Sequence, residues 1–121
     1  MTEERPSLAD ITQRLLEFRD ARDWRQFHSL KDLILSLNLE ASELLELAQW
    51  QGEEKFEANS QNEDVRRRIE EECADVLLYL LLIAERVGID LQVAAARKIA
   101  INDEKYPVAK ARGTATKYKN L

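Results

Sequence analysis

Residues that interrupt helices are scarce in this chain of 121 residues, which contains three glycines and two prolines. So few turn-forming residues leave little room for a β fold, because every hairpin needs a turn. Cysteine is equally scarce. Cys73 is alone, so an internal disulfide is excluded and a cytoplasmic location is expected. The sequence therefore predicts an all-α protein of the cytoplasm.

Long apolar runs are also missing. The N-terminal residues have no apolar segment typical of a signal peptide. The longest apolar run, at 74–84, spans eleven residues and is too short to cross a bilayer. We therefore expect no membrane-spanning segment and no membrane partner.

Acidic residues outnumber basic ones, 23 to 18, which gives a formal net charge of −5. This excess argues against a protein that binds the nucleic-acid backbone, because such proteins present basic surfaces. It suits a protein that holds cations. The chain is 45% hydrophobic and 34% charged, a composition typical of a globular protein whose helices have one apolar and one polar face.

Capping residues and helix breakers divide the chain into four predicted helices. Ser7, Ser29 and Asp90 are candidate N-caps, and Gly88 is a candidate stop signal. The helices are expected at about 8–22, 30–50, 63–87 and 91–105, with a polar loop at 52–62. Pro107 ends the helical core and leaves 108–121 as a tail. We predict one domain, 1–121, that is a four-helix bundle over about 7–107.

Two pairs of acidic residues are the strongest indication of function. Glu40 and Glu43, and then Glu72 and Asp75, are each three residues apart, so each pair lies on one helix face. Such pairs are usually solvent-exposed. Here, however, Glu40 and Glu43 interrupt an apolar stripe, and Asp75 is the only charge in the run 74–84. A carboxylate on an apolar face is costly unless it is paired or binds a metal. The four oxygen-bearing side chains predict a site for Mg²⁺, or for Mn²⁺.

The second half of the third predicted helix is apolar on all sides. Its large side chains span more than one helix face, so we expect that one chain cannot cover them all: Leu77, Leu78, Leu80, Leu81, Leu82 and Ile83. Self-association is the expected consequence, with a homodimer as the minimum and a homotetramer next.

Other polar and aromatic residues are open to two interpretations. Lys98, Asn102 and Tyr106 form one stripe on the fourth predicted helix, flanked by Lys105, and suit phosphate oxygens. The alternative is a solvated, cationic helix end. Four aromatic residues either stack on a nucleobase or belong to the core: Trp24, Phe27, Trp50 and Tyr79.

Taken together, these motifs resemble a known family. The pattern E-x-x-E, a spacer of 28 residues and E-x-x-D resembles the MazG-type all-α nucleoside triphosphate pyrophosphohydrolases. Within that superfamily, W-x-Q-F-H at 24–28, Gln49-Trp50 and K-x-x-x-N-x-x-K-Y-P at 98–107 resemble the dCTP pyrophosphatase branch. The resemblance covers roughly residues 8–118.

The resemblance implies an activity and a set of site residues. The reaction would convert a deoxynucleoside triphosphate, dCTP or a modified dCTP first, to monophosphate and diphosphate. Four carboxylates would be the Mg²⁺ ligands and the catalytic centre: Glu40, Glu43, Glu72 and Asp75. The nucleoside pocket would contain Trp24, Phe27, His28, Trp50 and Tyr79. The phosphates would be reached by Lys98, Asn102 and Tyr106, from the same subunit or a neighbouring one, with Lys31 as a further candidate. One departure concerns base choice: dCTP-specific animal relatives carry a histidine where this chain has Leu15.

Two alternatives differ from this interpretation. One is the same fold acting on dUTP or another nucleotide, such as a phosphoribosyl nucleotide. The other is a non-enzymatic helical interaction module with solvent-facing acids, which would be indifferent to Mg²⁺. The chain has no P-loop, so ATP-driven work is not expected.

Overall fold

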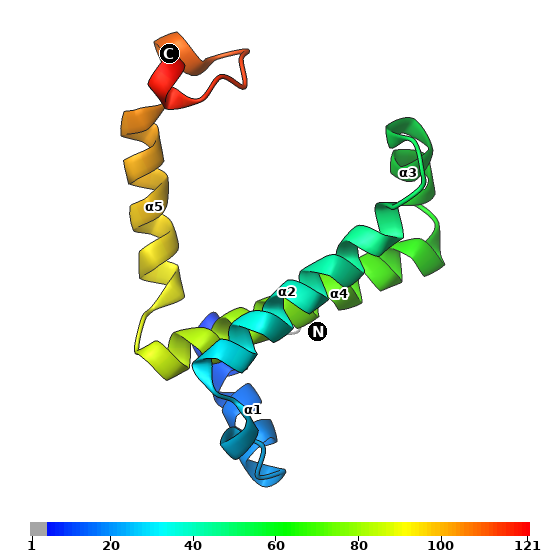
Figure 1. Cartoon of the computed structure of the whole chain (residues 1–121), viewed down its shortest axis with the longest axis vertical. Helices are drawn as coiled ribbons and strands as arrows, with labels where there is room; N and C mark the ends of the chain where they lie inside the picture. The colour runs from blue at the N-terminus through cyan, green and yellow to red at the C-terminus, as the bar shows by residue number, and fades with distance from the viewer. Residues whose placement is uncertain (1–4) are drawn as a thin grey trace. The chain divides into compact units, whose positions relative to one another are not determined.

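The computed structural model describes residues 5–121, and every regular element in that range is helical (Figure 1). The predicted all-α class is confirmed. The α-helices are α1 (Leu8–Ala21), α2 (Leu30–Ala48), α3 (Glu53–Asn59), α4 (Glu63–Val87), α5 (Leu91–Lys105) and α6 (Val108–Ala111). Two short 3₁₀ helices are η1 (Arg25–Phe27) and η2 (Tyr118–Asn120). The chain divides into two compact units, Met1–Gly88 and Ile89–Leu121, which are described separately below.

The predicted capping residues bound the long helices as expected: Ser7, Ser29 and Asp90 begin α1, α2 and α5, and Gly88 ends α4. Ser7 Oγ accepts a hydrogen bond from the backbone N–H of Asp10 at 3.0 Å, and the Asp10 carboxylate accepts one from the N–H of Ser7. Ser29 Oγ caps α2 by accepting a hydrogen bond from the backbone N–H of Asp32, and Asp90 Oδ1 caps α5 by accepting one from the N–H of Val93. Both donor–acceptor distances are 3.1 Å. Gly88 ends α4 with φ of 74°, a left-handed conformation that glycine adopts without strain.

Two regions contain more structure than predicted. The segment 52–62, expected to be a polar loop, contains α3, whose Phe56 is half-buried and anchors it. The negative charges of the acidic residues in its first turn interact favourably with the helix dipole and stabilise the helix. The segment 108–121, expected to be a tail, contains α6 and η2. Tyr118 packs edge-to-face on Tyr106 with ring centroids 6.0 Å apart, and Lys105 Nζ lies 4.9 Å from the Tyr118 ring centroid. The second unit is therefore folded back on itself at the end of α5.

The first unit is organised around α2 and α4, which run antiparallel and side by side (Figure 1). Its deepest side chains are Leu33 on α2 and Leu81, Leu82 and Ala84 on α4, which are 2–5% exposed. Leu81 and Leu82 are therefore covered within one chain, whereas Leu77 on the same helix is 36% exposed. The expectation that one chain cannot cover all six side chains is not overturned, and self-association stays a prediction. Further exposed apolar side chains lie on α2, where four are 50–64% exposed: Ile34, Leu35, Leu39 and Leu45. No helix within residues 5–121 has the length and apolar character needed to cross a membrane.

A buried arginine joins α1 to α4. Arg19 is 5% exposed and donates to the Glu85 carboxylate at 3.1 Å and to Asp20 at 2.8 Å. Its backbone carbonyl also accepts the N–H of Trp24 at 3.1 Å. One residue therefore holds the end of α1 against α4 and fixes the turn that follows.

We expect Glu85→Gln to lower the free energy of unfolding by about 1–3 kcal/mol, because it weakens a charge-assisted hydrogen bond to a buried cation. The exposed Glu17→Gln on α1 is the matched control and should stay within about 0.5 kcal/mol of wild type. Urea unfolding measures both. A double-mutant cycle with Arg19→Met isolates the pair, and strictly additive effects would contradict a coupled ion pair.

Candidate metal centre and nucleotide site

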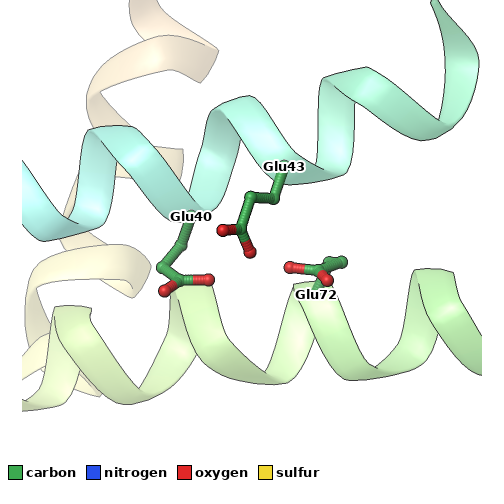
Figure 2. Close-up of side chains that lie close together, drawn as sticks. All are labelled: Glu40, Glu43 and Glu72. Atoms are coloured by element: carbon green, nitrogen blue, oxygen red, sulfur yellow. The ribbon is translucent and has the colours of Figure 1, made fainter.

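Three glutamates from two helices meet in the first unit. Glu40 and Glu43 lie one turn apart on α2, and Glu72 lies opposite them on α4 (Figure 2). One carboxylate oxygen from each residue lies within 4.8 Å of the others. The i, i+3 spacing on α2 and the antiparallel neighbour together produce this cluster. Like charges held this close repel one another, and a divalent cation bound to their oxygens would remove that repulsion.

Two oxygens of the cluster have no partner. Glu40 and Glu72 are half-buried, and Oε2 of each is buried without a hydrogen-bond donor from the described part of the chain. A buried carboxylate oxygen that lacks a donor is costly, so such atoms in native proteins usually have a ligand, a water or an ion. The cluster therefore has the chemistry of a site that could hold a divalent metal cation.

The electrostatics of the cluster agree with this interpretation. Partial burial raises the pKa of Glu40, and the negative charge of Glu43 raises it further. Partial burial also raises the pKa of Glu72, with Glu43 again contributing next. The charge of Asp75 contributes to both shifts, so Asp75 lies nearby, although it is not one of the three residues whose oxygens converge. The structure thus brings together three of the four predicted ligands and places the fourth beside them.

A hollow of about 560 Å³ adjoins the glutamates. It lies between α2 and α4 and is lined by Glu43, Glu46, Leu47, Arg68, Glu71 and Glu72. Its size falls within the range of small-molecule sites. Sequence reasoning missed Arg68. The signal was its position four residues before Glu72, which puts the two side chains on the same face of α4.

The predicted base-binding segment forms the corner between α1 and α2. Trp24 is 43% exposed and packs edge-to-face on Phe18, with ring centroids 5.6 Å apart. Asp23 has φ of 54°, so the chain bends sharply just before Trp24. His28 is half-buried, and its Nδ1 has no hydrogen-bond partner among residues 5–121. Phe27, at 65% exposed, completes the corner.

The other predicted site residues lie apart from this corner. Lys31 is exposed in the first turn of α2, and Tyr79 is half-buried on α4, one turn beyond Asp75. Trp50 follows the last residue of α2 closely, is 94% exposed and has φ of 68°. The 19 residues of α2 span about 28 Å, so Trp50 and the Trp24–His28 corner are at opposite ends of one helix.

The predicted phosphate-binding stripe belongs to the second unit. Lys98 and Asn102 are exposed on α5, and Tyr106 is half-buried beneath Tyr118. The cluster of three glutamates belongs to the first unit. Contact of these three side chains with a phosphate therefore stays a prediction.

An all-α fold with a cluster of carboxylates between two antiparallel helices defines a class of helical protein suited to a divalent cation. The chain belongs to the MazG-like family, whose model matches residues 35–121.

Two relatives and one solved structure are similar to this chain over most of its length. The chain is 40% identical over 116 residues to dCTP pyrophosphatase 1 of Bos taurus, covering 96% of this chain and 69% of the relative. It is 39% identical to dCTP pyrophosphatase 1 of Homo sapiens, covering 68% of that protein. Its structure is similar to the crystal structure of a pyrophosphatase from Archaeoglobus fulgidus DSM 4304. The TM-score is 0.76 with 36% sequence identity, over 88% of this chain and 98% of that one.

Neutralising one glutamate of the cluster should stabilise the metal-free protein. The pKa of Glu40 is higher in the folded state than in the unfolded chain. The contribution of Glu40 to the free energy of unfolding is therefore fully present below the ordinary glutamate pKa and is lost as the pH rises through the folded-state pKa. In chelator, Glu40→Gln should therefore raise Tm by a few degrees at pH 7.5 and by much less at pH 4.5. Differential scanning fluorimetry measures both values.

The same variant should lose the increase in Tm that added Mg²⁺ gives the wild type, because one oxygen ligand has lost its charge. Glu54→Gln, on the exposed face of α3, is the control and should behave as wild type in both conditions. A wild-type Tm that is insensitive to Mg²⁺ and Mn²⁺ would contradict a metal site here.

Proposed function

We propose that this protein is an Mg²⁺-dependent nucleoside triphosphate pyrophosphohydrolase that converts a deoxynucleoside triphosphate and water to the monophosphate and diphosphate. The favoured substrate is dCTP or a modified dCTP, in agreement with the names of the relatives. The observation that carries the proposal is the cluster of Glu40, Glu43 and Glu72, with its two unpartnered buried oxygens. Its biological role would be to remove unwanted nucleotides from the cellular pool.

The metal would be held by Glu40, Glu43 and Glu72, with Asp75 as the fourth carboxylate. Oxygen donors suit Mg²⁺, and Mn²⁺ takes the same ligand type. When bound, the ion neutralises phosphate charge and increases the acidity of a coordinated water. The four carboxylates cannot bind a triphosphate of about four negative charges by themselves, so the cation is what makes this acidic hollow accept an anion.

The chain's own residues position the reactants. Water attacks the α-phosphorus, the bond from that phosphorus to the oxygen that bridges to the β-phosphate breaks, and diphosphate leaves with the electron pair. No covalent nucleophile is needed. Glu46 and Glu71 line the hollow beside Glu43 and Glu72, where a carboxylate can accept the proton of the attacking water.

Recognition of the base requires more than one copy of the chain. The Trp24–His28 corner and Trp50 are about 28 Å apart along α2, farther than any nucleobase extends. If both contact the base, they come from different protomers of a homodimer or homotetramer. The half-exposed leucines and isoleucine of α2 favour such an assembly, because burying the remaining exposed part of each would contribute about 1–2 kcal/mol.

Removing one charged ligand should abolish turnover without unfolding the chain. Glu43→Gln and Asp75→Asn should each lower kcat/KM by about 100-fold or more, because the charge on the transferring group loses its counterion. Glu57→Gln, exposed on α3, should retain wild-type activity. Coupled assays for diphosphate and orthophosphate measure the products, and circular dichroism checks the helices.

The same assay on a panel of the common and modified triphosphates tests the substrate. We expect dCTP or a modified dCTP first, with weaker turnover of others. Highest efficiency on dUTP would support the alternative substrate, and equal efficiency on all would contradict a selective base pocket. Orthophosphate as the first product, or no response to Mg²⁺ at all, would contradict the proposed reaction.

A divided base pocket predicts complementation between defective chains. Trp24→Ala and Trp50→Ala should each raise KM, because each loses a stacking surface worth roughly 1–3 kcal/mol. In a mixed homodimer one of the two sites keeps both tryptophans, so co-refolded variants should regain about a quarter of the wild-type activity.

Trp50→Phe is the control, since it keeps an aromatic face and should retain most of the affinity. Light scattering at micromolar concentration measures the assembly directly. A monomeric wild type with full activity, or mixed variants that regain nothing, would contradict the divided pocket.

A further inference from the structure

One basic side chain lines the hollow beside the cluster of Glu40, Glu43 and Glu72. The hollow is bounded by four glutamates, Leu47 and Arg68, so Arg68 is the single cation among its lining residues. The glutamates Glu43 and Glu72 are shared between the hollow and the metal cluster. Whatever occupies the hollow therefore meets both the proposed metal and the Arg68 guanidinium.

The neighbours of Arg68 do not share this position. Residues 66–68 are three consecutive arginines on α4, and successive helical residues point about 100° apart. Arg67 is 64% exposed and pairs with Asp64 at 3.3 Å. Arg66 is exposed and lies outside the lining of the hollow. Register on the helix therefore selects one arginine of the three.

Arg68 forms no ion pair with the acidic residues around it in the described part of the chain. Within residues 5–121 the ion pairs involve Arg19 and Arg67, and none joins Arg68 to a glutamate of the hollow. Its guanidinium donors remain available to a ligand. A planar guanidinium fork matches two oxygens of a phosphate group, and it stays charged at any physiological pH.

We infer that Arg68 binds the phosphates beyond the α-phosphate of the nucleoside triphosphate, which leave together as diphosphate. Arg68 is one helical turn, about 6 Å along the axis, from Glu72, so it reaches past the metal cluster that holds the reacting α-phosphate. As the bond between the α-phosphorus and the bridging oxygen breaks, the charge that develops on the leaving diphosphate meets this guanidinium. The inference rests on the proposed pyrophosphohydrolase activity and adds a substrate-binding residue to it.

The test compares two of the three adjacent arginines. Arg68→Gln should lower kcat/KM by about 10- to 100-fold, because it removes a charge-assisted pair of hydrogen bonds. It should weaken the binding of diphosphate with Mg²⁺, measured by isothermal titration calorimetry, by a similar factor. Arg66→Gln makes the same chemical change one face away and should leave both values within about twofold of wild type. Arg68→Lys, which keeps the charge without the fork, should fall between.

The outcomes separate this inference from the proposed activity. Failure of the wild type to hydrolyse any triphosphate would refute the activity itself. An active wild type with equal kcat/KM and equal diphosphate affinity in Arg68→Gln and Arg66→Gln would refute the role of Arg68 alone. So would loss of activity in Arg68→Gln with normal diphosphate affinity. The increase in Tm with Mg²⁺ should persist in Arg68→Gln, which shows that the fold and the metal cluster are intact.

Discussion

Repulsion between carboxylates held at the interface of α2 and α4 is the constraint on which the proposed function of this chain depends. Packing of the two antiparallel helices brings one carboxylate oxygen each of Glu40, Glu43 and Glu72 within 4.8 Å of the others, and partial burial of Glu40 and Glu72 weakens the screening of their charges by water. The apolar side chains that hold the helices together lie elsewhere in the unit, at Leu33, Leu81 and Leu82. Packing of the apolar core therefore stabilises an arrangement that the repulsion between the three glutamates opposes. This is common where a site is preorganised for a ligand.

Much of this arrangement could be predicted from the sequence because it depends on local chemistry. Ser7, Ser29 and Asp90 cap helices through hydrogen bonds to their own neighbours, and Gly88 ends α4 through a backbone conformation that is intrinsic to glycine. The convergence of the glutamates required one further step, that two amphipathic helices pack through the faces that carry them. Helical spacing identifies those faces without knowledge of the fold.

Other features depend on information that spacing does not contain. Spacing places Arg68 on the same face of α4 as Glu72, but whether that face borders a hollow depends on the register between α4 and α2, which no local pattern specifies. The helix α3 was missed because its seven residues carry a single apolar anchor, Phe56, too few to show a period. Coverage of Leu81 and Leu82 depends on which elements pack against α4. The sequence pattern showed that the second half of α4 is apolar all round but not which neighbours would cover it.

The arrangement within the first unit separates the chemistry from the choice of base. One chain supplies all three glutamates of the cluster and the adjoining hollow, so the proposed metal centre needs no residue from a second copy. The aromatic residues that would read the base stand at the two ends of α2 and cannot meet within that copy. Under the proposed function, a substitution in the Trp24–His28 corner would change base preference while the glutamate cluster stays the same. If the proposed divided pocket is correct, assembly would be a requirement for selectivity, because a second copy would complete the pocket that discriminates between bases.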